Sequence, residues 1–152
     1  MLLSRFFTLE QLIFSETAAD RGIDNRPDAA AMNNLRRLAA GLDEVQMLLG
    51  LPLQITSGYR CPQLNQAVGG VAHSQHCQGL AADFDCPKYG SPLEVARAIA
   101  ESAIEFDQCI LEFGRWVHLS FAPEPRRRVL SIYDSAEGYL LGLIDTDGNQ
   151  LA

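Results

Sequence analysis

The most constraining feature of this sequence is an apolar stripe that lies on one face of a long amphipathic helix. Its residues alternate at spacings of three and four: Leu35, Leu38, Leu42, Val45 and Leu49. Gly50 is typical of a helix C-terminus, and Pro52 prevents the helix from continuing. Pro27 suits the first turn of a helix. We therefore predict one long helix between these two prolines.

Two shorter helical segments flank this helix. Thr8 and Gln11 have the spacing of a capping box, which predicts a helix over residues 9–15. The polar residues 16–26 are predicted to form a loop. After the long helix, residues 62–68 are expected to form one or two helical turns that end at a Gly-Gly pair.

The second half of the chain is dominated by strand patterns. Ser91-Pro92-x-Glu94 predicts one further helix, which runs to residue 102. Strands are predicted over six segments: 53–56, 80–86, 106–112, 116–121, 129–133 and 139–144. Helices come first, strands cluster later, and the crossovers are short. This order favours an α+β fold with a mainly antiparallel sheet.

The length and charge of the chain narrow its class. A chain of 152 residues suits one domain, so we expect a single domain with a helical part over 1–50, a central part over 53–121 and strands over 122–152. The net charge of -7 disfavours a nucleic-acid-binding protein, because such proteins neutralise phosphates with basic side chains. The run Arg126–Arg128 is expected to be a solvated edge.

No segment approaches the roughly 18 consecutive apolar residues of a membrane span, so no membrane insertion is expected. The apolar N-terminus is interrupted by Ser4, Arg5 and Glu10, and no A-x-A cleavage motif follows it. We therefore expect cytoplasmic synthesis without a signal peptide. The four cysteines contain no C-x-x-C pair and are expected to stay reduced: Cys61, Cys77, Cys86 and Cys109.

Two histidines and one aspartate are the candidate metal ligands. His76 precedes Asp83 by seven residues, so a loop imidazole and a strand carboxylate can converge on one ion. Strand alternation puts His118 on the face opposite its apolar neighbours. Such a set leaves a fourth zinc position for water, unless Cys77 fills it. On spacing alone, satisfied core histidines and exposed acids remain the alternative, and composition does not decide between His73 and His76.

Four separated motifs occur in order along the chain. They are S-G-Y-R at 57–60, N-x-x-V-G-G at 65–70, S-x-H-x-x-G-x-A-x-D at 74–83 and W-V-H at 116–118. Together they resemble the D-Ala-D-Ala metallopeptidase family, which includes zinc D-alanyl-D-alanine carboxypeptidases and phage endolysin peptidases. The resemblance covers residues 56–121. It implies the small α+β fold that these peptidases share with hedgehog-type domains, and one Zn²⁺ per chain.

The resemblance also implies roles for individual residues. The implied zinc ligands are His76, Asp83 and His118. Arg60 falls on the arginine that engages the substrate or the developing oxyanion, and a structural salt bridge is the alternative for it. Ser74 is implied to orient and support the substrate site. Trp116 is expected to line the substrate cleft, with core packing as the alternative.

The general base departs from the family's usual pattern. Family members commonly carry an acid three residues before the last histidine ligand, where this chain has Arg115. A three-residue hairpin loop, 113–115, would put Glu112 opposite Trp116 and on the face of His118, whereas a two-residue loop would turn it away. Glu112 is therefore the candidate base. The other candidates are Glu105, Asp107 and Asp85.

These interpretations predict a hydrolase: a monomeric zinc metallopeptidase that acts on peptidoglycan stem peptides of the cell wall. Both a D-Ala-D-Ala carboxypeptidase and an endolysin-type endopeptidase are open. A phage origin is implied by the resemblance of F-T-L-E-Q-L at 7–12 and F-G-x-W-V-H at 113–118 to a phage and prophage subgroup. Two alternatives come from other classes. One is a cell-wall binding module that has lost turnover, and the other is a phage structural protein.

Overall fold

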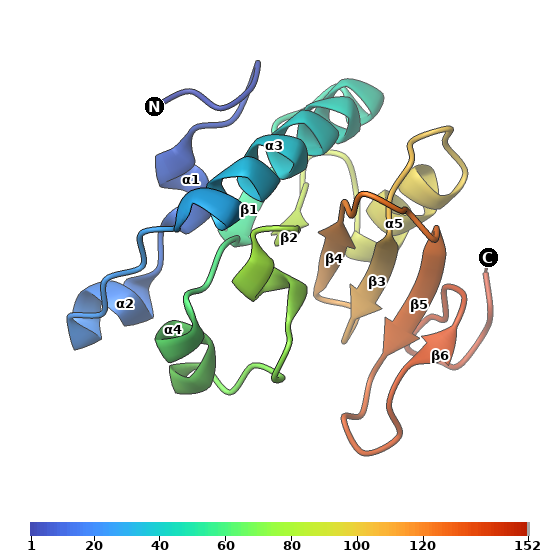
Figure 1. The fold of residues 1–152 in the computed structure, drawn as a ribbon. Coiled ribbons are helices and arrows are strands. Elements are labelled where there is room, and N and C mark those ends of the chain that lie inside the picture. Colours follow the sequence, from blue (N-terminus) through green and yellow to red (C-terminus); the bar gives the residue numbers. More distant parts are fainter. Residues whose placement is uncertain (152) are drawn as a thin grey trace.

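The computed structural model describes residues 1–151 and has a helical N-terminal half and a strand-rich C-terminal half (Figure 1). The helices are α1 (Leu9–Ile13), α2 (Glu16–Arg21), α3 (Ala29–Leu49), α4 (Pro62–Ala67), a short 3₁₀ turn η1 (Gln75–Gln78) and α5 (Pro92–Ala100). The strands are β1 (Gln54–Ser57), β2 (Ala81–Asp85), β3 (Gln108–Glu112), β4 (Trp116–Ser120), β5 (Arg128–Ile132) and β6 (Leu140–Leu141). The α+β prediction is confirmed.

The strands form one sheet in the order β1-β2-β4-β3-β5-β6. Neighbouring strands are antiparallel except β3 and β5, which run parallel. The mainly antiparallel sheet is therefore as predicted. Strands β2 and β4 lie side by side in its middle, and β1 forms one edge.

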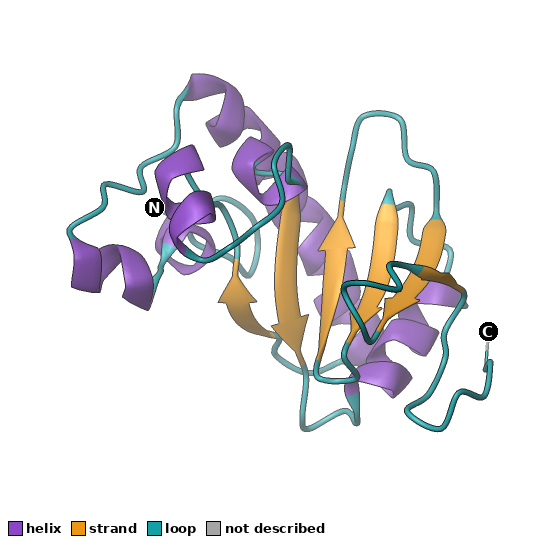
Figure 2. Cartoon of the chain, turned by 90° about the horizontal axis from the view of Figure 1, so that it is seen from below, coloured by secondary structure: helices purple, strands orange, loops and turns teal. Residues whose placement is uncertain are grey.

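Helices α3 and α5 cover one face of this sheet (Figure 2). The predicted apolar stripe of α3 is buried along its whole length and joins one core with Val117, Leu119 and Phe121. Gly41 allows α3 to pack directly against Phe121, because a Cβ at residue 41 would overlap the Phe121 ring. Since alternate residues of β4 point into this core, His118 points to the opposite face of the sheet.

The prediction of a loop over 16–26 is wrong, because residues 16–21 form α2. The Ser15 hydroxyl accepts a hydrogen bond from the Ala18 amide at the start of this helix, and Gly22 ends it in the left-handed conformation. Burial of Ala18 against the rest of the protein stabilises a helix too short to form alone. The other predicted elements exist, with ends that differ by a few residues.

The basic run at 126–128 has structural partners. Arg126 donates two hydrogen bonds, of 2.7 and 2.8 Å, to the buried carboxylate of Asp107. Arg127 donates to the backbone carbonyls of Ser102 and Ile104 and lies over the ring of Phe106. Two of the three arginines are thus tied to the protein rather than simply solvated.

None of the helices within residues 1–151 combines the length and the apolar content that crossing a membrane requires. All four cysteines are free thiols, and Cys86 and Cys109 are buried.

Candidate metal centre

The three predicted ligands meet where the middle of the sheet faces away from α3 and α5. Asp83 of β2 lies directly opposite His118 in the antiparallel pairing of β2 with β4. The 3₁₀ turn η1 brings His76 to the same place just before β2 begins. Gly79 permits the tight entry into β2, because it has a φ of 76° and an added Cβ would clash with the Ala31 carbonyl.

The ligand atoms are close enough to share one ion. His76 Nε2 lies 3.2 Å from Asp83 Oδ1, and His118 Nδ1 lies 3.0 Å from the same oxygen. The three atoms all lie within 4.8 Å of one another, and all three residues are buried. Two imidazole nitrogens and one carboxylate oxygen are the donor set of a catalytic zinc site with an open position.

The hydrogen bonding of His76 fits a metal ligand. Its Nδ1 lies 2.7 Å from the carbonyl oxygen of Gly58, which only accepts, so Nδ1 carries the proton. In the neutral ring the Nε2 lone pair then faces Asp83 and is free for a cation. A backbone carbonyl that sets the tautomer in this way is a common support for histidine ligands.

Asp83 is ionised, as a ligand must be. Burial disfavours its charged form, but the His118 and His76 side chains, when protonated, donate hydrogen bonds and positive charge that outweigh burial and hold the pKa of Asp83 below its usual range. A buried carboxylate against two imidazoles is stabilised further by a divalent cation between them. The donor set therefore fits Zn²⁺.

These three residues line a cavity of about 470 Å³. The other residues predicted from the sequence also line it: Arg60, Ser74, Glu112 and Trp116. Ser74 is buried, and its hydroxyl accepts a hydrogen bond of 3.1 Å from the His76 amide, which holds the η1 turn. Trp116 lies opposite Glu112 in the β3–β4 pairing, with its indole Nε1 buried, and its side chain acts to lower the pKa of Glu112.

Glu112 faces the metal ligands across the β3–β4 hairpin. Residues 113–115 form a three-residue loop, and Glu112 pairs with Trp116, which is the register required for the predicted geometry. Glu112 Oε1 lies 3.8 Å from His118 Nδ1. Burial and the nearby negative charge of Asp83 raise the pKa of Glu112, and the His118 side chain opposes them only in part.

The alternative bases lie elsewhere. Among the residues that the structure describes, the only carboxylates lining the metal cavity are those of Asp83 and Glu112. Asp107 is bound to Arg126 and Gln75 and lines a different cavity. Three other residues do not line the metal cavity: Glu105, Asp85 and the hairpin residue Arg115. Geometry favours Glu112.

Arg60 has no carboxylate partner in the described part of the chain. Its Nη1 donates a long hydrogen bond of 3.4 Å to the Ser57 hydroxyl, and its Nε is buried without any hydrogen bond. The alternative of a structural salt bridge therefore finds no counterpart within residues 1–151. A half-buried guanidinium in this state is available to an anion.

The sequence did not settle which neighbours of His76 take part, and the structure separates them. His73 is exposed, and both His73 and Cys77 line another cavity, which the metal ligands do not line. The metal group found among the described residues contains neither of them.

Two supports of the site were missed in the sequence. Asn25 is buried and bonds the Ile13 and Tyr59 carbonyls and the Cys61 amide, which fixes the loop that carries Arg60. Tyr139 lies on the loop between β5 and β6 and lines the metal cavity. Neither belongs to a motif, so no local signal marks them.

A comparison with protein families adds an independent observation. The sequence matches the family model described as Peptidase M15 over residues 5–120, which is more than half of the chain. This chain belongs to the peptidase M15 family. As an M15 peptidase it is a metallopeptidase, and peptidases of this family depend on a metal that is usually zinc. No curated protein matches the sequence.

The family match and the geometry meet at the same residues. The M15 region contains the three candidate ligands, Arg60 and Glu112. It ends at residue 120, so the wall of the metal cavity formed by Tyr139 lies outside it. The end of this cavity nearest β5 and β6 is therefore built by a segment that the family match does not cover.

Proposed function

We propose that this M15 peptidase hydrolyses peptide bonds in peptidoglycan stem peptides, with one Zn²⁺ held by His76 Nε2, Asp83 Oδ1 and His118 Nδ1. The observation that carries the proposal is the convergence of these three buried atoms within 4.8 Å beside a second carboxylate, Glu112. The bound ion would act as a Lewis acid and lower the pKa of a coordinated water.

Glu112 is proposed as the general base. Its carboxylate lies 3.8 Å from the ring nitrogen of His118 and lines the metal cavity, where it would accept a proton from the attacking water. The raised pKa of Glu112 brings it closer to the operating pH, where a base that later acts as an acid is most effective. Glu112 takes the proton of the attacking water and then delivers it to the leaving amine.

Arg60 is proposed to bind negative charge on the substrate. The guanidinium carries an unused donor at Nε and borders the metal cavity. It therefore suits either a substrate carboxylate or the oxyanion of the tetrahedral intermediate, both of which accept charge-assisted hydrogen bonds. Trp116 lines the same cavity and is proposed to contact the substrate.

The experiment that tests this function uses two synthetic stem peptides, one with a D-Ala-D-Ala terminus and one with an L-Ala-D-Glu bond. Zinc-loaded protein is expected to cleave at least one of them, as mass spectrometry of the products would show. Removal of the metal with a chelator should abolish cleavage, and added Zn²⁺ should restore it. Cleavage of neither peptide by protein with full zinc content would contradict the proposal.

Such a negative result would favour one of the two other functions. Calorimetric binding of an uncleaved peptide would then indicate a cell-wall binding module. Co-purification with virions, without peptide binding, would indicate a phage structural protein.

A further inference from the structure

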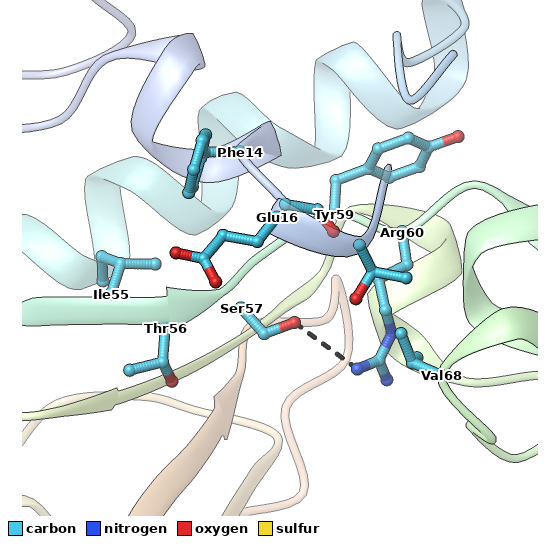
Figure 3. Close-up of a pocket in the computed structure, with 10 residues that line it drawn as sticks. Phe14, Glu16, Ile55, Thr56, Ser57, Tyr59, Arg60 and Val68 are labelled. Carbon is cyan, nitrogen blue, oxygen red and sulfur yellow. Dashed lines mark hydrogen bonds between the residues drawn. The ribbon is translucent and has the colours of Figure 1, made fainter. Parts of the chain in front are cut away.

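A second cavity of about 490 Å³ lies beside the metal cavity. It is bounded by the junction of α1 with α2, residues 14–17, and by the edge strand β1 (Figure 3). Arg60 and Val68 line both cavities, so the second cavity adjoins the metal cavity at this point. A ligand that starts at the metal centre can continue past Arg60 into this space.

The walls of the second cavity carry unpartnered apolar surface and an open strand edge. Phe14 is 64% exposed and Val68 is 44% exposed, although both are large apolar side chains. Within residues 1–151 strand β1 pairs only with β2, so its other edge has no strand partner there. An extended peptide can use such an edge for main-chain hydrogen bonds while apolar side chains contact its own.

The two charged residues of this cavity are both without an ion pair in the described part of the chain. The Arg60 side chain donates only to Ser57, and the exposed Glu16 carboxylate has neither a basic partner nor a hydrogen-bond donor. In Figure 3 the Glu16 carboxylate points along β1 toward Ile55 and Thr56, away from the guanidinium of Arg60. The cavity thus has a positive end at the metal centre and a negative end remote from it.

We propose that this second cavity binds the part of the peptide substrate next to the scissile bond, and that Glu16 binds a side-chain ammonium group of that peptide. The inference rests on the proposed function and adds the chemistry of a neighbouring substrate residue. A primary ammonium matches the isolated carboxylate, and an aliphatic side chain matches the apolar surface of Phe14 and Ile55 in the same cavity. Glu16 is then a specificity-determining residue that acts on binding and takes no part in bond cleavage.

The test compares pairs of substrate peptides that differ only in one side chain. One member carries lysine at a position flanking the scissile bond, and the other carries Nε-acetyl-lysine, which has the same stem without the charge. The proteins compared are the wild type, Glu16→Gln and Asp20→Asn. Asp20 lies on the same helix, is exposed and does not line the cavity, so its variant controls for the loss of one negative charge.

When lysine occupies one of the positions that flank the scissile bond, Glu16→Gln is expected to raise KM for the lysine peptide by about three- to tenfold. It should leave kcat within about twofold of the wild-type value. It should leave KM for the acetylated peptide unchanged, and Asp20→Asn should change neither value. The KM for the lysine peptide divided by the KM for the acetylated peptide is the deciding ratio. If it is the same in wild type and Glu16→Gln at every position, the inference is wrong, while continued turnover would leave the proposed function intact.

If the wild type cleaves neither peptide, the proposed function fails and calorimetry on zinc-loaded protein decides the inference separately. A Kd for the lysine peptide that rises three- to tenfold in Glu16→Gln, but not in Asp20→Asn, supports a binding role for Glu16. Identical Kd values in the three proteins, or no peptide binding at all, overturn it.

Discussion

Single side chains decide whether this centre holds a metal. His118→Ala removes one of three donors, so zinc content is expected to fall from about one ion per chain to well below it. His73→Ala is the matched control, because His73 is exposed and lines a different cavity. Atomic absorption on the purified variants checks both expectations. Equal zinc content in His118→Ala and wild type would refute the ligand assignment.

Asp107 makes a separate contribution that depends on pH. Hydrogen bonds from Arg126 lower the pKa of this buried carboxyl to about 2, against about 4 in an unfolded chain. The stabilisation that ionised Asp107 gives the folded protein is therefore complete above about pH 4 and is lost as the pH falls toward 2. Since Arg126 is half exposed, solvent screening limits the effect to about 1–2 kcal/mol.

Urea unfolding of Asp107→Asn at several pH values checks this expectation. The free energy of unfolding should drop near pH 7 and should fall less steeply than that of wild type between pH 4 and pH 2. Glu105→Gln, which changes an exposed neighbour, should behave as wild type. A variant Asp107→Asn with unchanged stability at both ends of this range would show that the pair contributes nothing.

Among the secondary-structure elements, α3 carries most of the helical side of the core. Leu38 lies in its buried stripe, so Leu38→Ala should lower the free energy of unfolding by about 2–5 kcal/mol. Arg37→Ala, on the exposed face of the same turn, should change it by less than about 0.5 kcal/mol. Chemical denaturation of the two variants measures the difference, and similar losses in both would contradict the amphipathic assignment.

The elements with strong local signals were predictable from the sequence. The capping box of Thr8 and Gln11, the stripe of α3 and the alternation around His118 each depend on neighbours within a few residues. Helix α2 escaped prediction because Ser15 caps it without an acidic or amide partner three residues later, and contacts with distant residues stabilise it. Its position matters, because Glu16 borders the second cavity.

The site as a three-dimensional arrangement was only partly predictable. The side of the sheet on which Glu112 and His118 lie follows from strand periodicity and the loop length. The lack of a partner for Arg60, the bridge formed by Asn25 and the wall formed by Tyr139 depend on contacts between residues far apart in the chain. No local pattern reports such contacts.

For the protein as a folded unit, the thiols test whether the core needs any covalent support. Mass spectrometry after alkylation in denaturant without reductant is expected to find four modified cysteines. Under native conditions Cys109 should stay unmodified, because complete burial raises its pKa to about 12. Two or fewer modified cysteines in denaturant would reveal disulfides and contradict a core that is stable without them.

The most direct test of the central claim measures peptide hydrolysis and zinc content together in Glu112→Gln. The substitution keeps the shape of the side chain and removes the proton acceptor, so kcat is expected to fall by about 10²–10⁴-fold. Zinc should stay near one ion per chain, because Glu112 is not among the three ligands. Arg115→Ala, on the exposed hairpin, should retain nearly full activity. Full activity of zinc-loaded Glu112→Gln would contradict the account.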